Sequence, residues 1–379
     1  MFQPVYLEET LQPHLKKLEE ERLIIAAKVS ARTKAVVGTC LGLLAALLAY
    51  QAFLWQQGFP LVLLLVGALV AAIVLLIVGS ISYVLLTGKL KKNYEKTIKG
   101  KLYEKALRNY NPTIEYYPQQ HIEESAFKKA GLFGGFNRFG GDDLCTGKLA
   151  DGRSFRFSEL KVYRKSKNTG SSGSSKTKTV TIFEGLFYEM QLPQSVEVAV
   201  RIVPDRGEAF GAVGKFMQGM LNKALKAFSL EDPLVDFGQQ YPNFEHAFKV
   251  YCKEERVARQ LISPDFVEKI TALNQDLGGE VYLAFQENHC YWGVRRGDFL
   301  KVNLQTSLLG TVFLDQLEEN LDWCFDRLRQ LDNLTTAEKG SAIEGIQETK
   351  IEEEKDRIPP QKTSVSYKKS NSKDNPFLL

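Results

Sequence analysis

The sequence predicts an α+β protein in which a two-helix transmembrane hairpin precedes a mixed strand-and-helix domain. Two long charge-free apolar runs stand near its start, segments rich in β-branched and aromatic residues follow, and helical periodicity returns after them. This order favours α+β over an alternating parallel sheet. One version of such a domain is a small barrel-like sheet with a C-terminal capping helix.

The two apolar runs are long enough to cross a bilayer. Residues 35–55 and 60–86 contain no Asp, Glu, Lys or Arg, and about 20 apolar residues suffice to span the hydrocarbon core. A short turn around Gly58 separates them, and Pro60 suits the first turn of the second helix. We therefore expect a membrane hairpin over residues 35–86.

Cationic residues flank the hairpin on one side only. Lys28, Arg32 and Lys34 precede it and eight Lys or Arg residues follow it between positions 89 and 108, whereas the turn has none. Because Lys and Arg are retained on the cytoplasmic side, we predict an inner (plasma) membrane protein with both termini in the cytoplasm. The lipid bilayer is its expected partner, with anionic headgroups attracted to the cations after the second span. Those predicted to contact the membrane are Lys91, Lys92 and Lys96.

Small residues recur every four positions in the spans, at Gly38, Gly42 and Ala46 and again at Gly67 and Ala71. Such spacing lets helices approach closely. We expect this face to pack within the hairpin, with dimerisation as the alternative. Since neither span contains Asp, Glu, Lys, Arg or His, the hairpin is interpreted as an anchor and not as a transport path.

Amphipathic segments border the hairpin. Within residues 1–34, positions 7–29 have helical apolar spacing, with Glu19, Glu20 and Glu21 expected to face solvent. Residues 87–120 are predicted to form a basic juxtamembrane helix and a linker. We expect the two helices to pack together.

The soluble α+β domain is predicted over residues 121–334. Turn-forming residues separate its expected strands, and a Gly/Ser-rich stretch, 165–178, is expected to be a flexible loop without a site. A hairpin turning at Glu287 and Asn288 is expected between two later strands. The predicted strands are 144–149, 154–164, 179–192, 196–203, 280–286 and 289–295. The predicted helices are 209–228, 254–262, 264–276 and 313–331. Residues 335–379 lose apolar periodicity, which is typical of a disordered tail.

The sequence offers no catalytic, cofactor or metal motif. Its five cysteines are scattered without a CxxC pair, and its four histidines do not cluster. The glycine-rich stretch 207–216 lacks the spacing of a phosphate-binding loop. A net charge of +4 is small for a nucleic-acid-binding protein. We therefore predict no cofactor, no metal and no nucleic-acid partner.

One predicted helix has a pronounced apolar face opposite a cationic one. Such a helix could lie in the membrane interface or grip a membrane protein partner. The alternative is that it packs on the sheet of its own domain. Its face consists of Phe210, Val213, Met217, Met220, Leu221, Leu225 and Phe228.

Several short motifs resemble a known bacterial family. They are Phe183–Phe187, Phe244–Tyr251, Ala258-Arg259 and Ser263-Pro264. Together they resemble domain-of-unknown-function family thirty-one thirty-seven, most closely over residues 185–302. The resemblance implies an N-terminal membrane hairpin before a soluble domain, and it supplies no catalytic residues.

These observations favour a membrane-anchored cytoplasmic binding or scaffold module over an enzyme, and they select no oligomeric state. The alternative is a membrane-tethered enzyme with an unrecognised active site. Residues with suitable chemistry for that alternative are His246, Glu245, Arg259, Asp265, Cys252 and His289. A polar pocket in which they converge would support it.

Overall fold

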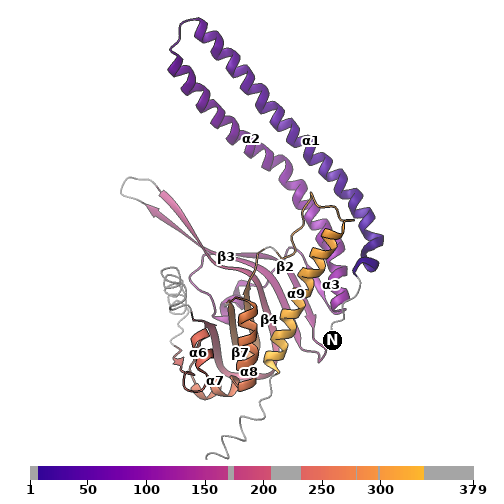
Figure 1. The fold of residues 1–379 in the computed structure, drawn as a ribbon, viewed down its shortest axis with the longest axis vertical. Helices are drawn as coiled ribbons and strands as arrows, with labels where there is room; N and C mark the ends of the chain where they lie inside the picture. The colour runs from indigo at the N-terminus through magenta and orange to yellow at the C-terminus, as the bar shows by residue number, and fades with distance from the viewer. Residues whose placement is uncertain (1–6, 170–174, 206–231, 279, 298, 337–379) are drawn as a thin grey trace, which may run out of the picture. The chain divides into compact units, whose positions relative to one another are not determined.

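The computed structural model of the protein describes residues 7–169, 175–205, 232–278, 280–297 and 299–336. Within these ranges, two long helices lead into a mixed antiparallel sheet flanked by shorter helices (Figure 1). The predicted helix 209–228 and the predicted tail lie almost wholly outside them. The domain boundaries drawn from the sequence stay predictions.

The first two helices form the expected hairpin. Helix α1 spans Leu7–Gln56 and α2 spans Leu61–Ile98, with Gly58 in the left-handed region at φ +87° in the turn. Both are long and apolar enough to cross a membrane. Their most apolar segments have mean hydropathies of 1.9 and 3.4 and are not buried. A core helix of a soluble protein would instead bury such a segment.

The helices continue without interruption from the apolar spans into the domain. Helix α1 contains both the predicted N-terminal helix and the first span. Helix α2 passes through a π-helical turn, η1 (Lys99–Tyr103), into α3 (Glu104–Tyr110). The apolar spans and the segments that follow or precede them are therefore not joined by loops.

The expectation that all the small residues pack inside the hairpin was wrong for α1. A Cβ added at Gly38 or Gly42 would meet no atom within 4 Å, so these glycines do not face α2. Close approach occurs elsewhere, where a Cβ on Gly79 would lie 3.0 Å from the Cys40 sulfur. Packing of α1 on α2 thus leaves the Gly38–Gly42 face open.

The described strands form one open sheet in the order β1-β2-β3-β4-β6-β5, with β7 also paired to β4. All pairings are antiparallel, and the sheet does not close, so the barrel-like version was wrong. Closure would require the short edge strands β1 and β5 to find partners. The strands are β1 (Glu115–Tyr117), β2 (Arg138–Lys148), β3 (Ser154–Thr169), β4 (Ser175–Pro204), β5 (Leu234–Val235), β6 (Phe248–Cys252) and β7 (Val281–Arg295).

Two strands that the sequence divides are each continuous. The segments 179–192 and 196–203 both belong to β4, and the hairpin predicted around Glu287 is a single strand, β7. The two strands pair on both sides of a shared irregularity, at which Val196 lies opposite Glu287. Glu287 has a φ of +53° there, as in a β-bulge. A local polar interruption therefore marks a bend in a long strand and not a turn.

The strands extend further than expected beyond the body of the sheet. β3 runs to Thr169 and β4 begins at Ser175, so most of the predicted loop 165–178 is paired strand. The segments on either side of the Gly/Ser-rich centre contain β-branched residues and pair with each other as strands. We call residues 164–169 and 175–180 the β3–β4 arm.

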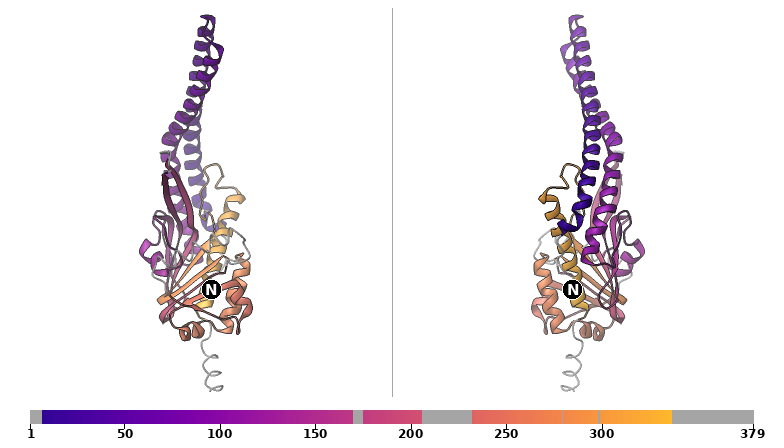
Figure 2. Two further views of the ribbon diagram at one scale, coloured as in Figure 1. Left: turned by 90° about the vertical axis from the view of Figure 1, so that its left-hand side faces the viewer. Right: turned by 90° about the vertical axis from the view of Figure 1, so that its right-hand side faces the viewer.

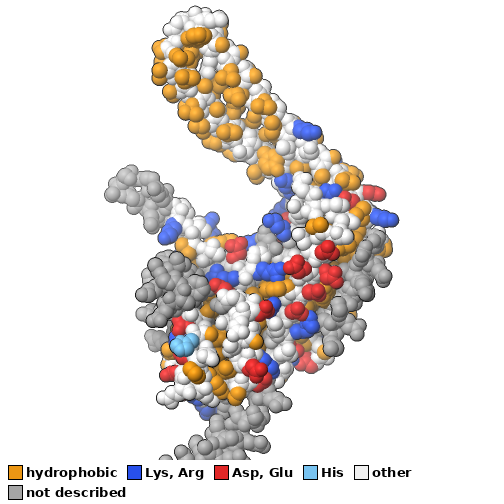
Figure 3. Space-filling view, in the orientation of Figure 1, with side chains coloured by type: hydrophobic (Ala, Val, Ile, Leu, Met, Phe, Trp, Pro, Cys, Tyr) orange, Lys and Arg blue, Asp and Glu red, His pale blue; other side chains and the backbone are white. Residues whose placement is uncertain are grey.

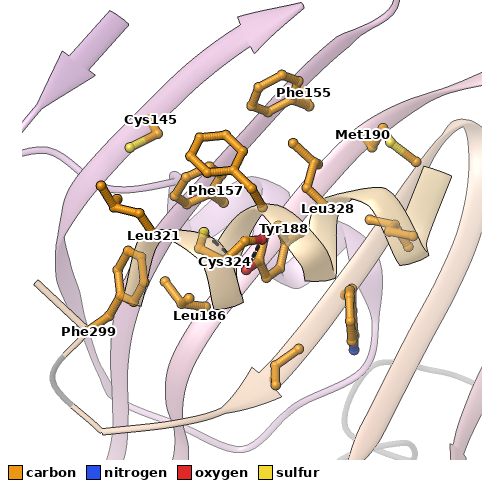
Figure 4. Close-up of a cluster of buried hydrophobic side chains, with 14 of the residues drawn as sticks. Cys145, Phe155, Phe157, Leu186, Tyr188, Met190, Phe299, Leu321, Cys324 and Leu328 are labelled. Atoms are coloured by element: carbon orange, nitrogen blue, oxygen red, sulfur yellow. Dashed lines mark hydrogen bonds between the residues drawn. The ribbon is translucent and has the colours of Figure 1, made fainter. Parts of the chain in front are cut away.

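Both faces of the sheet are covered, because apolar side chains alternate between two hydrophobic clusters. Leu186 and Tyr188 belong to one cluster, and Phe187 between them belongs to the other. The larger cluster includes α9 (Thr311–Thr335), which crosses the sheet, and Tyr188 contacts Cys324 within it (Figures 2 and 4). The remaining helices are α4 (Glu124–Ala130), α6 (Pro242–Ala247), α7 (Glu255–Leu261) and α8 (Pro264–Asp276).

The structure confirms the helices predicted from local sequence signals in the last part of the described chain. Helix α8 has the bounds expected from its pattern, because Pro264 occupies the first turn and the Ser263 hydroxyl accepts a hydrogen bond from the Phe266 amide at 3.2 Å. Helix α9 contains the whole predicted segment 313–331. Helix α7 agrees within two residues.

Gly185 provides a test of the central β4–β7 pairing. Its φ is +153°, and an added Cβ would clash with the carbonyl oxygen of Val294. We expect Gly185→Ala to lower the free energy of unfolding by about 3 kcal/mol through strain and displacement of β7. Thermal unfolding of the full chain in detergent, followed by Trp fluorescence, measures this. Gly140→Ala is the control, since a Cβ there meets nothing within 4 Å; equal losses in both variants would contradict the assignment.

Candidate functional site

The base of the hairpin and the sheet share one hydrophobic cluster. Leu11, Leu15 and Leu18 of α1 and Ile98 and Leu102 after the second span are all at most 3% exposed within it. The same cluster contains residues of β3, β4, β7 and α9. The membrane-length helices are thus built into the domain that follows them.

A buried ion pair fixes α1 to the loop before α9. The Glu19 carboxylate accepts hydrogen bonds from the Arg22 guanidinium at 2.7 and 2.8 Å and from the Leu308 amide at 2.9 Å. Arg22 in turn donates to the Leu304 carbonyl oxygen at 2.8 Å. The hydrogen bond from Arg22 is the main cause that lowers the pKa of Glu19, so the carboxylate is charged at neutral pH. We call this arrangement the Glu19–Arg22 clasp.

The clasp corrects one expectation from the sequence. Glu19 was assigned to the solvent face, but it is 7% exposed and Arg22 is 8% exposed. A signal for Arg22 existed, because Leu11, Leu15 and Leu18 continue to position 22 with helical spacing. The burial of its partner Glu19 could not be foreseen, since the Leu308 amide that Glu19 also binds lies 289 positions away.

A second buried ionic group joins η1 to β2. The Lys99 ammonium lies 2.7 Å from Asp143 and 3.5 Å from Asp142, and the Tyr116 hydroxyl donates to Asp143 at 2.5 Å. Asp143 has a φ of +58° at a break in the β2–β3 register, which directs its side chain toward Lys99. We call Lys99, Asp142, Asp143 and Tyr116 the Lys99 cluster.

Burial and the charges of its neighbours set the protonation of this cluster. Burial raises the pKa of Asp143 to about 7, Lys99 opposes that change, and the negative charge of Asp142 adds to it. For Lys99, burial by itself would lower the pKa, but the surrounding carboxylates outweigh it and raise the pKa above its usual value. The ammonium therefore stays charged while Asp143 titrates near neutral pH.

The carboxylates around Lys99 resemble a cation site in composition. Oxygen atoms of Asp142, Asp143 and Glu159 all lie within 4.8 Å of one another, and hard cations prefer such ligands. Lys99 already forms ion pairs with both aspartates, and Glu159 accepts a hydrogen bond from the Phe299 amide at 3.0 Å. A metal ion would have to displace an ammonium, so the geometry favours a structural ionic joint.

The predicted membrane-contact lysines lie on α2 between the apolar span and the Lys99 cluster. Lys92 and Lys96 are exposed, whereas the Lys91 ammonium donates to the Tyr83 hydroxyl at 2.7 Å and lies over its ring. Apolar side chains cover the outer part of the hairpin, and Lys and Arg appear toward its base (Figure 3). Of the three, Lys92 and Lys96 are the ones that extend into solvent.

A cationic cavity of about 380 Å³ lies between α1 and the η1–α3 segment. Two of its cations are paired with acids, Lys101 with Glu21 at 3.3 Å and Arg108 with Glu104 at 2.9 Å. The Lys105 ammonium lies 2.5 Å from the His14 ring. The local acids offset much of this positive charge. The cavity is lined by His14, Lys17, Leu18, Gly100, Lys101, Glu104, Lys105 and Arg108.

The apolar face predicted as a membrane or partner contact cannot be placed. All seven of its residues lie outside the described part of the chain, so it stays a prediction. They are Phe210, Val213, Met217, Met220, Leu221, Leu225 and Phe228.

The residues considered for catalysis have separate local roles. Glu245 accepts a hydrogen bond from a backbone amide and pairs with Lys249 at 3.0 Å. Arg259 pairs with Glu255 at 2.6 Å, one turn away on α7. Asp265 forms a similar one-turn pair within α8. These pairs stabilise surfaces and helix ends.

The Cys and His candidates likewise show no nucleophile–base pair. The Cys252 thiol is buried and directed at the Glu254 carbonyl oxygen, 3.1 Å away, and burial raises its pKa. His246 is exposed, and the His289 ring lies 3.8 Å from Glu189. A buried thiol with a raised pKa is a poor nucleophile. Within the described residues, the arrangement gives the enzyme alternative no support.

The fold and the shared cluster at the base of the hairpin, which we call the junction, define a class of protein. In this class a helical hairpin of membrane-spanning length is built into a mixed antiparallel sheet-and-helix domain. Residues 181–333 match the family model described as "Protein of unknown function (DUF3137)". The chain thus carries a domain of this family, which confirms the resemblance seen in its motifs. No curated protein matches the sequence.

One solved structure is distantly similar. It is described as "crystal structure of the mycobacterial trehalose monomycolate transport factor A, TtfA", and the alignment covers 62% of this chain and 92% of that one. The sequences are 9% identical and the TM-score is 0.30. Similarity of this degree does not establish a shared fold or function.

The raised pKa of Asp143 makes the junction sensitive to pH. An unfolded Asp loses its proton near pH 3.9, whereas the folded chain retains this one to about pH 7. The free energy of unfolding should therefore fall as pH rises between these values, by at most about 1.4 kcal/mol per pH unit. We expect Asp143→Asn to remove that slope in thermal unfolding of the full chain from pH 5 to 8.

The matched control for this measurement is Asp265→Asn, which removes a carboxylate from a half-exposed pair. It should keep the wild-type slope. Identical pH slopes for wild type and Asp143→Asn would contradict the assigned titration.

Proposed function

We propose that this protein is a membrane-anchored binding or scaffold module whose domain is held close to the cytoplasmic face of the inner membrane. The observation that carries the proposal is the junction, where the bases of both membrane-length helices belong to the same hydrophobic cluster as the sheet. A flexible linker would let the domain move away from the bilayer. Continuous helices, the Glu19–Arg22 clasp and the Lys99 cluster keep it near.

Charge supports the orientation. Lys28, Arg32 and Lys34 and the lysines from position 89 onward flank the base of the hairpin, and the turn at Gly58 has no cation. The positive-inside tendency then places the turn outside and the domain in the cytoplasm. The hairpin spans contain no Asp, Glu, Lys, Arg or His, which favours anchoring over transport.

Anionic lipid headgroups are the first binding partner that we propose. Lys92 and Lys96 are exposed on α2, on the domain side of the apolar span. Each Lys near an anionic surface contributes about 1 kcal/mol. The predicted apolar face within residues 210–228 is proposed as a second contact, with membrane or with a protein partner.

The orientation can be tested by labelling engineered cysteines. We expect Gln57→Cys, in the turn, to react with a membrane-impermeant maleimide in intact spheroplasts. Lys253→Cys, on the exposed surface of the domain, should react only after the membrane is opened. The native cysteines interfere little, because four are buried and Cys40 lies within the span.

Wild-type protein labelled under the same conditions gives the background of this experiment. Labelling of Lys253→Cys in intact spheroplasts, with Gln57→Cys protected, would reverse the orientation. Extraction of the full chain from membranes by alkaline carbonate would contradict the anchor itself.

Lipid binding can be tested by the phospholipids that co-purify with the full chain in mild detergent. We expect the variant Lys92→Gln/Lys96→Gln to retain several-fold less phosphatidylglycerol than wild type, because two charges near the headgroups are lost. The matched control is Lys148→Gln/Lys253→Gln, which removes two exposed lysines, one at the end of β2 and one between β6 and α7. Equal retention by both variants would contradict a role for the α2 lysines.

A further inference from the structure

The β3–β4 arm extends beyond every neighbouring strand that the structure describes. The last β2 pair on β3 is Arg138 with Tyr163, and the last β7 pair on β4 is Arg295 with Gly185. Beyond them, six residues of β3 pair only with six residues of β4. At about 3.3 Å per residue, the arm reaches roughly 20 Å from the body of the sheet.

A two-stranded ribbon of this kind has little stability by itself in water. The base of the arm is nevertheless fixed. The Asn137 side chain accepts a hydrogen bond from the Lys165 amide at 2.9 Å and donates to the Lys165 carbonyl oxygen at 2.8 Å. Arg164 donates to the carbonyl oxygen of Gly135. The loop before β2 therefore sets the direction in which the arm leaves the sheet.

The arm is strongly cationic. Residues 164–169 and 175–180 include five Lys or Arg residues and no Asp or Glu. At the base of the arm, Lys161 is paired with Glu159 at 3.0 Å. Lys165 and Lys178 are exposed on the arm. The five cations are Arg164, Lys165, Lys167, Lys176 and Lys178. A local surface with this balance attracts anions and repels cationic partners.

The arm projects to the same side of the sheet as the helical hairpin. Figure 1 shows that β3 and β4 extend beyond the sheet on the side from which α2 also extends, and away from α6–α8, and the views in Figure 2 agree. The bases of the hairpin and of the arm are connected through β2. Lys99, which follows α2, forms ion pairs with Asp142 and Asp143 on β2, and β2 pairs with β3 at the base of the arm. If the hairpin enters a bilayer, the arm faces the surface of that bilayer.

We infer that the β3–β4 arm is a further membrane contact, separate from the α2 lysines, and that it binds anionic phospholipid headgroups beside the anchor. The inference rests on the proposed anchoring and adds a site in a segment whose sequence suggested only a loop. Two attachments on different elements, the hairpin and the arm, fix the rotation of the domain about the hairpin axis. One face of the domain is then always presented to the cytoplasm.

The test uses the full chain with Ser166→Cys, a position exposed on the arm, labelled with a fluorophore. The protein is reconstituted in vesicles of phosphatidylcholine, with or without phosphatidylglycerol, that carry a nitroxide on a lipid headgroup. We expect strong quenching only when phosphatidylglycerol is present, and loss of that quenching at high salt. Labelled wild type, whose own cysteines are buried or within the span, gives the background.

Charge reversal separates the arm from the rest of the surface. Each lysine lost from an anionic surface weakens attachment about fivefold, so Lys165→Glu/Lys178→Glu should reduce quenching to the level seen in phosphatidylcholine alone. The control Lys148→Glu/Lys253→Glu makes the same change in net charge at exposed positions away from the arm, and it should leave quenching unchanged.

Two outcomes would overturn the inference. One is equal quenching in the two kinds of vesicle, and the other is equal loss in the arm and control variants. Failure of the arm is distinguishable from failure of the anchor. A chain that resists alkaline extraction but shows no quenching contradicts the arm alone, whereas a chain that is extracted contradicts the anchor.

Discussion

The hydrophobic cluster shared by the hairpin base and the sheet is the constraint on which the other features depend. Leu11, Leu15 and Leu18 fill one side of it, and removing them from the sheet would expose large apolar surfaces on both partners. The Glu19–Arg22 clasp and the Lys99 cluster lie at this boundary. Their charges are tolerated there because each is paired and hydrogen-bonded. Through this packing, a hairpin of membrane-spanning length becomes part of a folded domain.

The long strands connect this shared hydrophobic cluster to the rest of the sheet. β4 pairs with β3, β6 and β7, so the position of the hairpin base is transmitted to the cationic arm at one end and to the α6–α8 region at the other. The irregularity at Val196 and Glu287 bends both long strands together. Side chains on the two faces then meet α9 and α4 separately. Of the binding surfaces that we propose, those on α2 and on the arm lie on the side of the sheet from which the hairpin extends (Figure 1).

Local signals predicted elements well where one physical cause was sufficient. Charge-free runs identified the hairpin, and Ser263 with Pro264 fixed the start of α8. The same reasoning failed at Glu287, where a polar pair looks alike in a turn and in a bulge. It also failed at Glu19, because helix periodicity cannot show which acidic residue meets a distant loop. For the candidate site, the sequence named the α2 lysines and the apolar face within 210–228; the contact made by these lysines stays a prediction, and the apolar face lies outside the described residues.

The sequence alone determined the membrane-length hairpin, the family resemblance, the late helices and the concentration of cations after the second span. These properties depend on composition and on spacing within a few turns of chain. Only the tertiary structure decided that the sheet stays open, that β4 and β7 are continuous, and that Lys99 meets Asp143. Each depends on contacts between residues far apart in sequence, which no local pattern encodes. From the sequence, the hairpin is interpreted as an anchor. In the structure, the packing of its base makes it part of the hydrophobic core of the domain.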